Sequence, residues 1–332
     1  MSKKITGIKK IAVLRALQLG DMLCAVPAFR ALRHAYPDAE ITLLGLPWAA
    51  SFVQRFSHYF DRFIHFPGYT GLPEQPFDET RWSPFTEHMQ QEEFDLILQM
   101  QGNGTIVNPM LKQFNALYFA GFHNKASYVD SQLFMEYPNY GSEVRRHLML
   151  MQHLGIDALG IELEFPLTRN DYTERDELLL PVTYKQYVCV HAGSRGSWRQ
   201  WPPGHFALLA DYCNDKGYIA VLTGTKDEEE ITREVRKSLQ QPAIDVTGLT
   251  SLGCLAVLLK EARLLISNCT GVAHMAAAVQ TPGVIISMDG EPERWAHPIH
   301  AVIDWNTQPS LQKVLDCIDE LLNRNEVQQV HL

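Results

Sequence analysis

Residues Leu264 to Met288, LLISNCTGVAHMAAAVQTPGVIISM, decide the fold. The stretch opens with a short apolar run, residues 264–266, of the length and composition of a buried parallel strand. Small polar residues break the run, and apolar residues then recur at helical spacing, so we expect a helix to start near Thr270. Residues 281–283, Thr-Pro-Gly, end that helix, and residues 284–286 form the next strand.

The turn between the first strand and the helix has two interpretations. A small-residue turn that runs directly into a helix leaves free backbone N–H groups at the positive end of the helix dipole, which suits a phosphate or diphosphate. The alternative is an ordinary strand–turn–helix unit in which Thr270 is the N-cap. The local pattern alone leaves both open.

Composition limits the class of protein. A chain of 332 residues, 46% of them hydrophobic, predicts two domains of similar size, each with its own core. No apolar run reaches the roughly 18 residues that a membrane span needs. The net charge of −9 argues against a general nucleic-acid binder. The six cysteines form no C-x-x-C pair, which argues against a zinc site or a disulfide framework and favours a reducing compartment. We expect a soluble, cytoplasmic protein.

In the first half, residues 10–14, 40–44 and 94–98 read as strands of a parallel sheet. Because proline is tolerated only in the first turn of a helix, Pro27 predicts that the first helix begins near Leu23 or Cys24. Asp21 would then lie in the loop at the carboxyl end of the first strand, where open α/β sheets bind ligands. It is either a capping and dipole-pairing residue or a carboxylate able to accept a proton. The segment 67–84 is rich in proline and glycine and predicts an exposed excursion.

In the second half, the strand 187–191 leads into a loop rich in glycine, serine and arginine. Such a loop suits a diphosphate, although Arg195 and Arg199 could equally be solvated charges. The strand 218–222 leads to Glu228, which is either part of an acidic first helical turn or a carboxylate placed to hold a ribose diol. The continuing alternation of strands and helices predicts a second doubly wound sheet, with a closing helix over 311–322.

Several stretches in fixed order resemble the heptosyltransferases, glycosyltransferase family 9. They are LGDMLCAVPAFRALRHAYPDAEITLL, VCVHAGSRGSWRQWPPGHFALLA, VLTGTKDEEE, DVTGLTSLGCLAVLLKEARLLISNCTGVAHMAAA and DGEPERW. The resemblance implies an α/β protein of two Rossmann-like doubly wound domains facing across a cleft, the glycosyltransferase-B architecture. We expect an acceptor-binding domain over residues 1–175 and a nucleotide-sugar-binding domain over 176–332.

The resemblance also implies roles for residues. The catalytic base falls on Asp21, and the adenosine-side carboxylate falls near Glu228. The donor-binding residues otherwise fall on two loops and the helix after the second: Ser194, Arg195, Arg199, Asn268, Cys269, Thr270, Gly271 and His274. His274 also has a plainer interpretation as a packed, hydrogen-bonded histidine.

One position departs from the family. The residue before Thr-Gly is normally Asp, and here it is Cys269. A cysteine beside a helix N-terminus and near Arg195 and Arg199 should have a thiol pKa below the free value of about 8.5, so we expect Cys269 to be the first cysteine to react with an alkylating reagent. The remaining five cysteines should be mostly buried.

The activity implied is inverting transfer of a heptose-like sugar from a nucleotide-sugar donor, typically ADP-heptose. The acceptor would be the lipopolysaccharide core or another cell-surface glycolipid or saccharide. No D-x-D motif is present, so no metal is expected, and no cofactor either. A peripheral contact with the inner face of the inner membrane is left open. Two alternatives remain: a sugar-nucleotide epimerase of similar architecture, and a degenerate carbohydrate-binding protein without turnover, for which Cys269 is the best argument.

Overall fold

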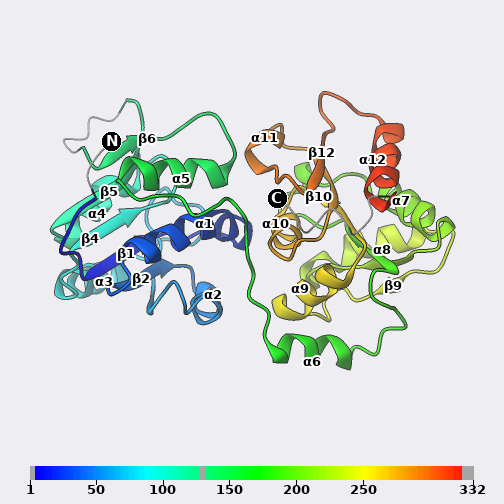
Figure 1. Cartoon of the computed structure of the whole chain (residues 1–332), viewed down its shortest axis with the longest axis horizontal. Coiled ribbons are helices and arrows are strands. Elements are labelled where there is room, and N and C mark those ends of the chain that lie inside the picture. The colour runs from blue at the N-terminus through cyan, green and yellow to red at the C-terminus, as the bar shows by residue number, and fades with distance from the viewer. Residues whose placement is uncertain (1–3, 127–131, 324–332) are drawn as a thin grey trace. The chain divides into compact units, whose positions relative to one another are not determined.

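The computed structural model describes residues 4–126 and 132–323, so the ends of the two expected domain ranges, 1–3 and 324–332, lie outside it. The chain divides into two compact units, Met1–Glu162 and Leu163–Leu332. Each contains one six-stranded parallel sheet with helices packed against it (Figure 1). The expected class, α/β with two Rossmann-like doubly wound sheets, is confirmed.

The sheet of the first unit has the order β3-β2-β1-β4-β5-β6. Its strands are β1 (Lys10–Leu14), β2 (Glu40–Gly45), β3 (Arg62–His65), β4 (Leu96–Gln99), β5 (Tyr118–His123) and β6 (Phe134–Glu136). The helices are α1 (Leu19–Ala35), α2 (Ala49–Arg55), α3 (Glu79–Gln91), α4 (Val107–Leu111), the 3-10 helix η1 (Lys112–Phe114) and α5 (Glu143–His153).

Strand β1 lies in the middle of this sheet and is buried on both faces. Ala12 and Leu14 belong to one core cluster, which also contains Phe85 and Met89 of α3. Because side chains alternate along a strand, Ile11 and Val13 face the other side of the sheet. Burial on both faces explains why this strand reads as a continuous apolar run.

Helix α1 corrects the expected helix start. It begins at Leu19, four or five residues before the predicted position, and Pro27 lies inside it. Asp21 is therefore in the first helical turn and not in a loop. Proline cannot donate the backbone bond of its position, but tertiary burial of an apolar face contributes more to helix stability than propensity does. Met22, Leu23 and the residues up to Phe29 are buried.

The segment 67–84 is also partly different from the expected excursion. Its last residues form the start of α3, where the side chain of the N-cap Asp78 accepts a hydrogen bond from the backbone N–H of Thr80. Pro84 lies inside this helix. The part before Asp78 has no regular helix or strand.

The sheet of the second unit has the order β12-β11-β10-β7-β8-β9. Its strands are β7 (Tyr187–His191), β8 (Ile219–Leu222), β9 (Ile244–Asp245), β10 (Leu264–Asn268), β11 (Gly283–Ser287) and β12 (His300–Asp304). The α-helices are α6 (Arg169–Glu177), α7 (Pro203–Asp215), α8 (Glu229–Ser238), α9 (Leu252–Glu261), α10 (Gly271–Ala278), α11 (Pro292–Trp295) and α12 (Leu311–Asn323). Two 3-10 helices, η2 (Ser197–Arg199) and η3 (Lys226–Glu228), follow β7 and β8.

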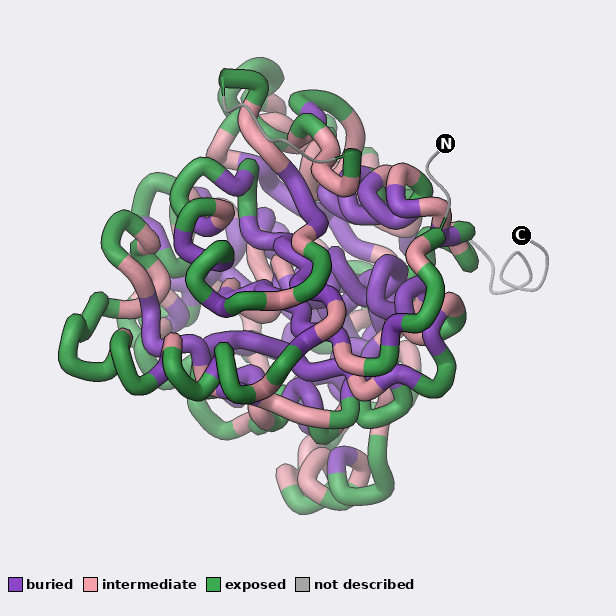
Figure 2. The backbone as a smooth tube through the Cα atoms, turned by 90° about the vertical axis from the view of Figure 1, so that its left-hand side faces the viewer, coloured by how far each residue is buried: buried purple, intermediate pink, exposed green. Residues whose placement is uncertain are grey.

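Strands β10 and β7 lie in the middle of this second sheet, and all of their residues are buried. Figure 2 colours buried backbone purple. One face of the sheet is covered by α7 and α12, whose apolar residues share a core cluster with Val188 and Val190 of β7. On the other face, the Tyr187 hydroxyl donates a hydrogen bond of 2.6 Å to the carbonyl of Leu258 in α9.

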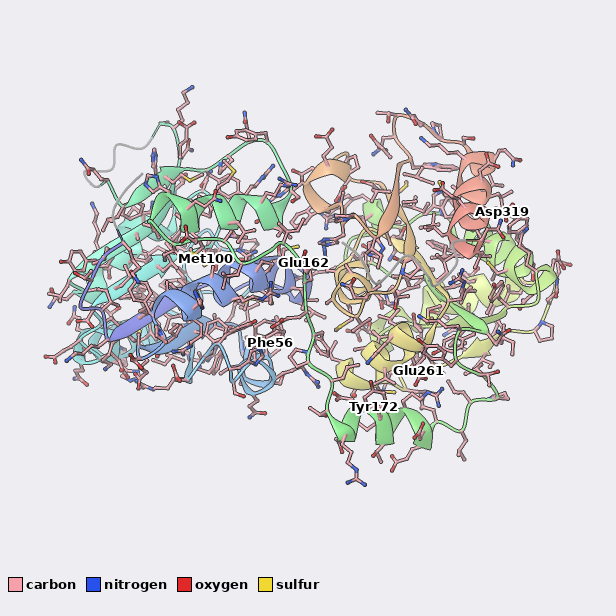
Figure 3. The ribbon with its side chains drawn as sticks, in the orientation of Figure 1. Phe56, Met100, Glu162, Tyr172, Glu261 and Asp319 are labelled. Carbon is pink, nitrogen blue, oxygen red and sulfur yellow. The ribbon has the colours of Figure 1, made fainter. Side chains whose placement is uncertain are left out.

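The division between the two units falls after residue 162, whereas the expected boundary was at 175/176. Helix α6 belongs to the second unit because it packs beside α9 (Figure 3, labels Tyr172 and Glu261). Lys260 donates a hydrogen bond of 2.9 Å to the Tyr172 hydroxyl, and Arg175 pairs with Glu261 at 2.6 Å. The polar residues of α6 are therefore explained by its contacts with α9, which are hydrogen bonds and an ion pair.

Candidate active site

The predicted donor loop lies at the carboxyl end of β10. Helix α10 begins at Gly271, and Thr270 is its N-cap. Thr270 does not act as a capping side chain, because its hydroxyl makes no hydrogen bond within the described parts of the chain. The hydroxyl of Ser194 and the Nε of Arg199, both on the loop after β7, are likewise buried without a hydrogen-bond partner there. A helix N-terminus and three unused polar groups form an arrangement that suits an anion.

Asn268 has a structural task in this region. Its side chain is fully buried, and its Oδ1 accepts a hydrogen bond of 2.9 Å from the backbone N–H of Trp201. Its Nδ2 donates to the carbonyl of Ala192 at 2.7 Å. The amide therefore fastens both ends of the loop after β7 to the end of β10. Its predicted contact with a donor stays a prediction, and its observed bonds run to the protein backbone.

The two arginines of the loop after β7 differ. Arg195 is exposed, as a solvated loop charge would be. The Nη2 of Arg199 lies 3.1 Å from Oδ2 of Asp289, whose side chain is almost completely buried. Asp289 follows β11 and is a residue that the sequence interpretation did not assign to the site. Its position two residues after the end of β11, within the stretch DGEPERW, is the signal that could have identified it.

Glu228 lies at the end of η3 and forms a capping box with Thr225, whose backbone N–H donates to Oε2 at 2.8 Å. The same oxygen lies 3.5 Å from Nε2 of His191. Burial opposes ionisation, but the hydrogen bonds from His191 and Thr225 outweigh it and lower the pKa of Glu228 to about 2. A Cβ on Gly193 would lie 2.2 Å from this carboxylate, so only glycine fits beneath it. The acidic-first-turn interpretation is confirmed, and a role toward a ribose stays a prediction.

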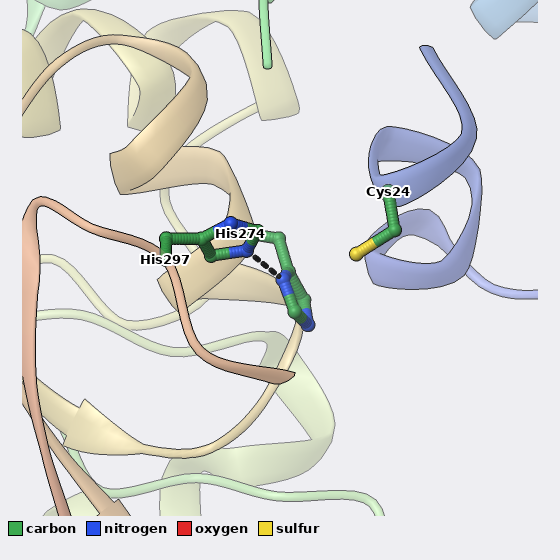
Figure 4. Close-up of side chains that lie close together, drawn as sticks. All are labelled: Cys24, His274 and His297. Atoms are coloured by element: carbon green, nitrogen blue, oxygen red, sulfur yellow. Dashed lines mark hydrogen bonds between the residues drawn. The ribbon is translucent and has the colours of Figure 1, made fainter. Parts of the chain in front are cut away.

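His274 lies in α10 and is buried. Its Nδ1 is 2.6 Å from Nε2 of His297, so one imidazole donates a hydrogen bond to the other (Figure 4). Nε2 of His300 lies 2.9 Å from the carbonyl of Ala273 in the same helix. Burial and the neighbouring histidines lower the pKa of His297 to about 2, and burial lowers that of His300 to about 4. The packed, hydrogen-bonded interpretation describes His274 as observed.

Asp21 lies in the other unit, in the first turn of α1, where a negative charge is favoured by the helix dipole. The N-cap of this helix is Gln18, so Asp21 is not the capping residue. The first turn is held instead by Arg15, which follows β1 and donates two hydrogen bonds, of 3.1 and 2.7 Å, to the main-chain carbonyl of Asp21. Arg15 also donates to the carbonyl of Met100, which follows β4 (Figure 3).

Arg15 belongs to a buried group of charges. Glu143 of α5 lies 3.8 Å from Nη2 of Arg15, and His147, one turn further along α5, lies 3.2 Å from the same carboxylate. The Tyr137 hydroxyl donates to the other oxygen of Glu143 at 3.0 Å. This group connects the carboxyl ends of β1 and β4 to helix α5, and the sequence interpretation counted none of it as part of the site.

Comparison with known proteins decides the family. The model of glycosyltransferase family 9 (heptosyltransferase) matches residues 82–314. The chain belongs to this family. It is therefore a glycosyltransferase, as the sequence resemblance predicts.

Individual relatives are distant. Lipopolysaccharide heptosyltransferase 2 of Escherichia coli K12 is 22% identical over 310 residues, which cover 86% of this chain and 84% of that protein. A shorter match to lipooligosaccharide heptosyltransferase 2 of Haemophilus ducreyi is 31% identical over 99 residues and covers 29% of this chain and 28% of that protein.

Solved structures agree on the fold. A family 9 glycosyltransferase from Veillonella parvula has a TM-score of 0.81 at 18% identity and covers 97% of this chain and 99% of its own. The ADP-heptose lipopolysaccharide heptosyltransferase II of E. coli has a TM-score of 0.70 at 18% identity, covering 95% and 98%. The two-sheet α/β architecture is that of glycosyltransferase-B enzymes. Among the described residues no helix is long and apolar enough to span a bilayer.

Cys269, the position at which the sequence resemblance implies a departure from the family pattern, corrects an expectation. The thiol is buried, and burial together with the nearby Asp289 carboxylate raises its pKa to about 12, although Arg199 acts in the opposite direction. The predicted lowering of its pKa is wrong, first because the thiol is buried and second because Asp289 offsets the charge of Arg199. Cys24, Cys189, Cys213 and Cys254 are buried as expected, and Cys317 is the half-buried one.

Proposed function

We propose that this family 9 enzyme transfers a heptose from ADP-heptose to a sugar hydroxyl of the lipopolysaccharide core or a related cell-surface glycan, with inversion at the anomeric carbon. Names of relatives support the donor and acceptor classes, since E. coli proteins similar to this chain are named for lipopolysaccharide and ADP-heptose. The transfer would take place in the cytoplasm, with a peripheral contact at the inner membrane where the glycolipid acceptor lies.

The observation that carries the proposal is the group of unused polar atoms around the start of α10. The hydroxyls of Ser194 and Thr270 and the Nε of Arg199 are buried without partners in the described chain. Such atoms also occur elsewhere in the described chain, but these three lie on the loops at the carboxyl ends of β7 and β10, where a ligand of an open α/β sheet would bind. The backbone N–H groups at Gly271 and the guanidinium would bind a diphosphate, which carries the charge that such groups favour.

The proposed reaction is a displacement at the anomeric carbon of the donor sugar. The acceptor oxygen attacks the anomeric carbon, and the bond from that carbon to the diphosphate oxygen breaks. Asp21 takes the proton of the acceptor hydroxyl as general base. An aspartate is a weak base, but the acceptor oxygen becomes acidic as its bond to carbon forms, so the proton can leave late. The nucleoside diphosphate departs as an anion stabilised by Arg199 and the α10 N-terminus.

Glu228 would hold the ribose of the donor. One of its oxygens is already bound by Thr225 and lies near His191. A carboxylate whose pKa is about 2 is ionised throughout the physiological range and accepts hydrogen bonds from a diol without changing its charge. The Nε2 atom of His191, 3.5 Å from Oε2, helps to orient the Glu228 carboxylate.

The experiment is nucleotide release from ADP-heptose, measured with and without a truncated lipopolysaccharide core. Release that requires the acceptor supports the proposal. Isomerisation of the donor without acceptor would indicate an epimerase instead, and binding without turnover would indicate a carbohydrate-binding protein. Substituting UDP- and GDP-sugars for the donor tests the adenine preference in the same assay.

A further inference from the structure

The ion pair between Arg199 and Asp289 crosses the end of β10. In the sheet, β10 lies between β7 and β11. Arg199 is on the loop that follows β7, and Asp289 is on the loop that follows β11. The two side chains meet at 3.1 Å, so the pair joins the loops on either side of the turn that contains Cys269 and Thr270.

Asp289 is a fixed and buried group. Its side chain is 6% exposed. Its Oδ1 accepts a hydrogen bond of 2.9 Å from the hydroxyl of Ser287 and one of 3.3 Å from the backbone N–H of Glu291. Oδ2 is the atom that faces Arg199. Burying a carboxylate costs free energy unless it is paired, and the contacts with Ser287, Glu291 and Arg199 offset that cost here.

Asp289 is also the neighbour of position 269. The backbone N–H of Cys269 donates to the carbonyl of Ile286 at 2.9 Å, which places Cys269 beside Ser287 in the parallel register. The charge of this carboxylate contributes, after burial, to the raised pKa of the Cys269 thiol. The turn before α10 therefore has a carboxylate next to it, but that carboxylate comes from the adjacent loop.

We propose that Asp289 supplies the carboxylate on the sugar side of the donor site, in place of residue 269, and accepts a hydrogen bond from a hydroxyl of the donor sugar. This inference rests on the proposed function. A carboxylate accepts from hydroxyls and repels phosphate, so Asp289 recognises the sugar and not the diphosphate. Arg199 lies against it, and the unused Nε of Arg199 remains for a phosphate oxygen. Asp289 is thus a specificity-determining residue that also positions Arg199.

The test uses three variants: Asp289→Asn, Cys269→Asp, and the double variant with both changes. Asp319→Asn, which removes a carboxylate of α12 that pairs with Lys216, is the matched control. Binding of ADP and of ADP-heptose is measured by titration calorimetry on each full chain, and thermal melting confirms folding. ADP-heptose carries the sugar where ADP has a free, ionised phosphate oxygen, so a loss of affinity confined to ADP-heptose reports the sugar contact.

We expect Asp289→Asn to weaken ADP-heptose binding about 10- to 100-fold, the scale of a hydrogen bond to a charged group, and ADP binding less than about 3-fold. Cys269→Asp should also weaken ADP-heptose binding, because two adjacent carboxylates repel each other. The double variant, with one carboxylate moved to position 269, should recover most of the loss.

Equal weakening of ADP and ADP-heptose by Asp289→Asn would overturn the inference, since Asp289 would then act only through Arg199. An unchanged affinity for ADP-heptose, or a double variant as weak as Asp289→Asn, would overturn it too. A wild-type chain that binds neither ligand would overturn the proposed function itself. A wild-type chain that binds ADP-heptose but shows no acceptor-dependent release would refute the transfer and leave the sugar contact to be judged by the variants.

Discussion

Arg15 donates two hydrogen bonds to the main-chain carbonyl of Asp21, at 3.1 and 2.7 Å, from a side chain that is itself completely buried. The proposed base is therefore held through its backbone by a residue at the end of β1. Gln18, the N-cap of α1, makes no side-chain capping bond. Arg15 does not replace such a bond, because a cap accepts from backbone N–H groups, but its two bonds to the Asp21 carbonyl fix the first turn of α1 to the end of β1.

Replacing Arg15 tests this support. Lysine keeps the positive charge near Glu143 but cannot make the same pair of bonds to one carbonyl. We expect Arg15→Lys to lower kcat about 10- to 100-fold, the cost of misplacing a catalytic group by about 1 Å, with donor affinity unchanged. Steady-state kinetics and donor titration provide the measurement. Arg145→Lys, an exposed change on α5, is the control, and a normal kcat in Arg15→Lys would refute the positioning role.

Arg199 should be needed for the donor and a divalent metal should not. The chain has no D-x-D motif, and the charge of Arg199 is placed beside the start of α10. Activity should survive a chelator, whereas Arg199→Ala should weaken donor binding by about 1.5–3 kcal/mol, the scale of a charge-assisted hydrogen bond. Arg233→Ala, on the exposed side of α8, is the control. Activity that is lost in chelator and restored by magnesium would contradict the prediction.

Cysteine labelling should begin at Cys317 and not at Cys269. Cys317 is half-buried on α12, whereas Cys269 is buried and has a thiol pKa raised to about 12. Only the thiolate reacts readily, so Cys269 should label slowly at neutral pH. Mass mapping after a short exposure to iodoacetamide gives the order of reaction. Cys317→Ser should remove the fast phase of labelling. Rapid labelling of Cys269 in the wild type would contradict the prediction, because it would mean that the thiol is accessible to the reagent.

The histidines beside α10 should make the protein sensitive to mild acid. His297 and His300 have pKa values of about 2 and 4 in the folded protein, below the value of about 6.5 in an unfolded chain. Between pH 6.5 and 4 the unfolded chain binds more protons, so stability is complete above pH 6.5 and falls as the pH is lowered. In the middle of this window each histidine contributes on the order of 1 kcal/mol per pH unit.

Denaturant unfolding at pH 7.5 and at pH 4.5 checks this expectation. His297→Gln should lose less stability between the two pH values than the wild type does, although it is less stable at pH 7.5. His88→Gln, a largely exposed change on α3, should keep the wild-type difference. An identical pH dependence in His297→Gln and the wild type would show that His297 is not the group that titrates.

Much of the fold could be predicted because the central strands are apolar on both faces. Strands β1, β2, β7, β10 and β11 all appear as short apolar runs in the sequence. The edge strands β3, β6 and β12 were not predicted, because a strand such as RFIH carries polar residues and no clear alternation. The start of α1 was placed too late, since the local cost of Pro27 gave no information about the burial that stabilises the helix around it.

The site was predictable where it follows a strand directly and not where it depends on strand order. The loop after β10 and the loop after β7 were both identified from their residues. The pairing of Arg199 with Asp289 needs β7 and β11 to flank β10, which a sequence read in chain order does not reveal. The error on Cys269 has two causes: the sequence did not show that its thiol is buried, and it did not show that Asp289 lies beside Arg199.

The central claim is that Asp21 accepts the proton of the acceptor hydroxyl, and acceptor-dependent release of ADP from ADP-heptose by Asp21→Asn tests it most directly. We predict that turnover falls by about two to four orders of magnitude, the usual contribution of a general base, while ADP-heptose affinity and melting temperature stay close to those of the wild type. Normal turnover in Asp21→Asn would contradict the account, and a large loss of melting temperature would assign Asp21 to the stability of the first turn of α1.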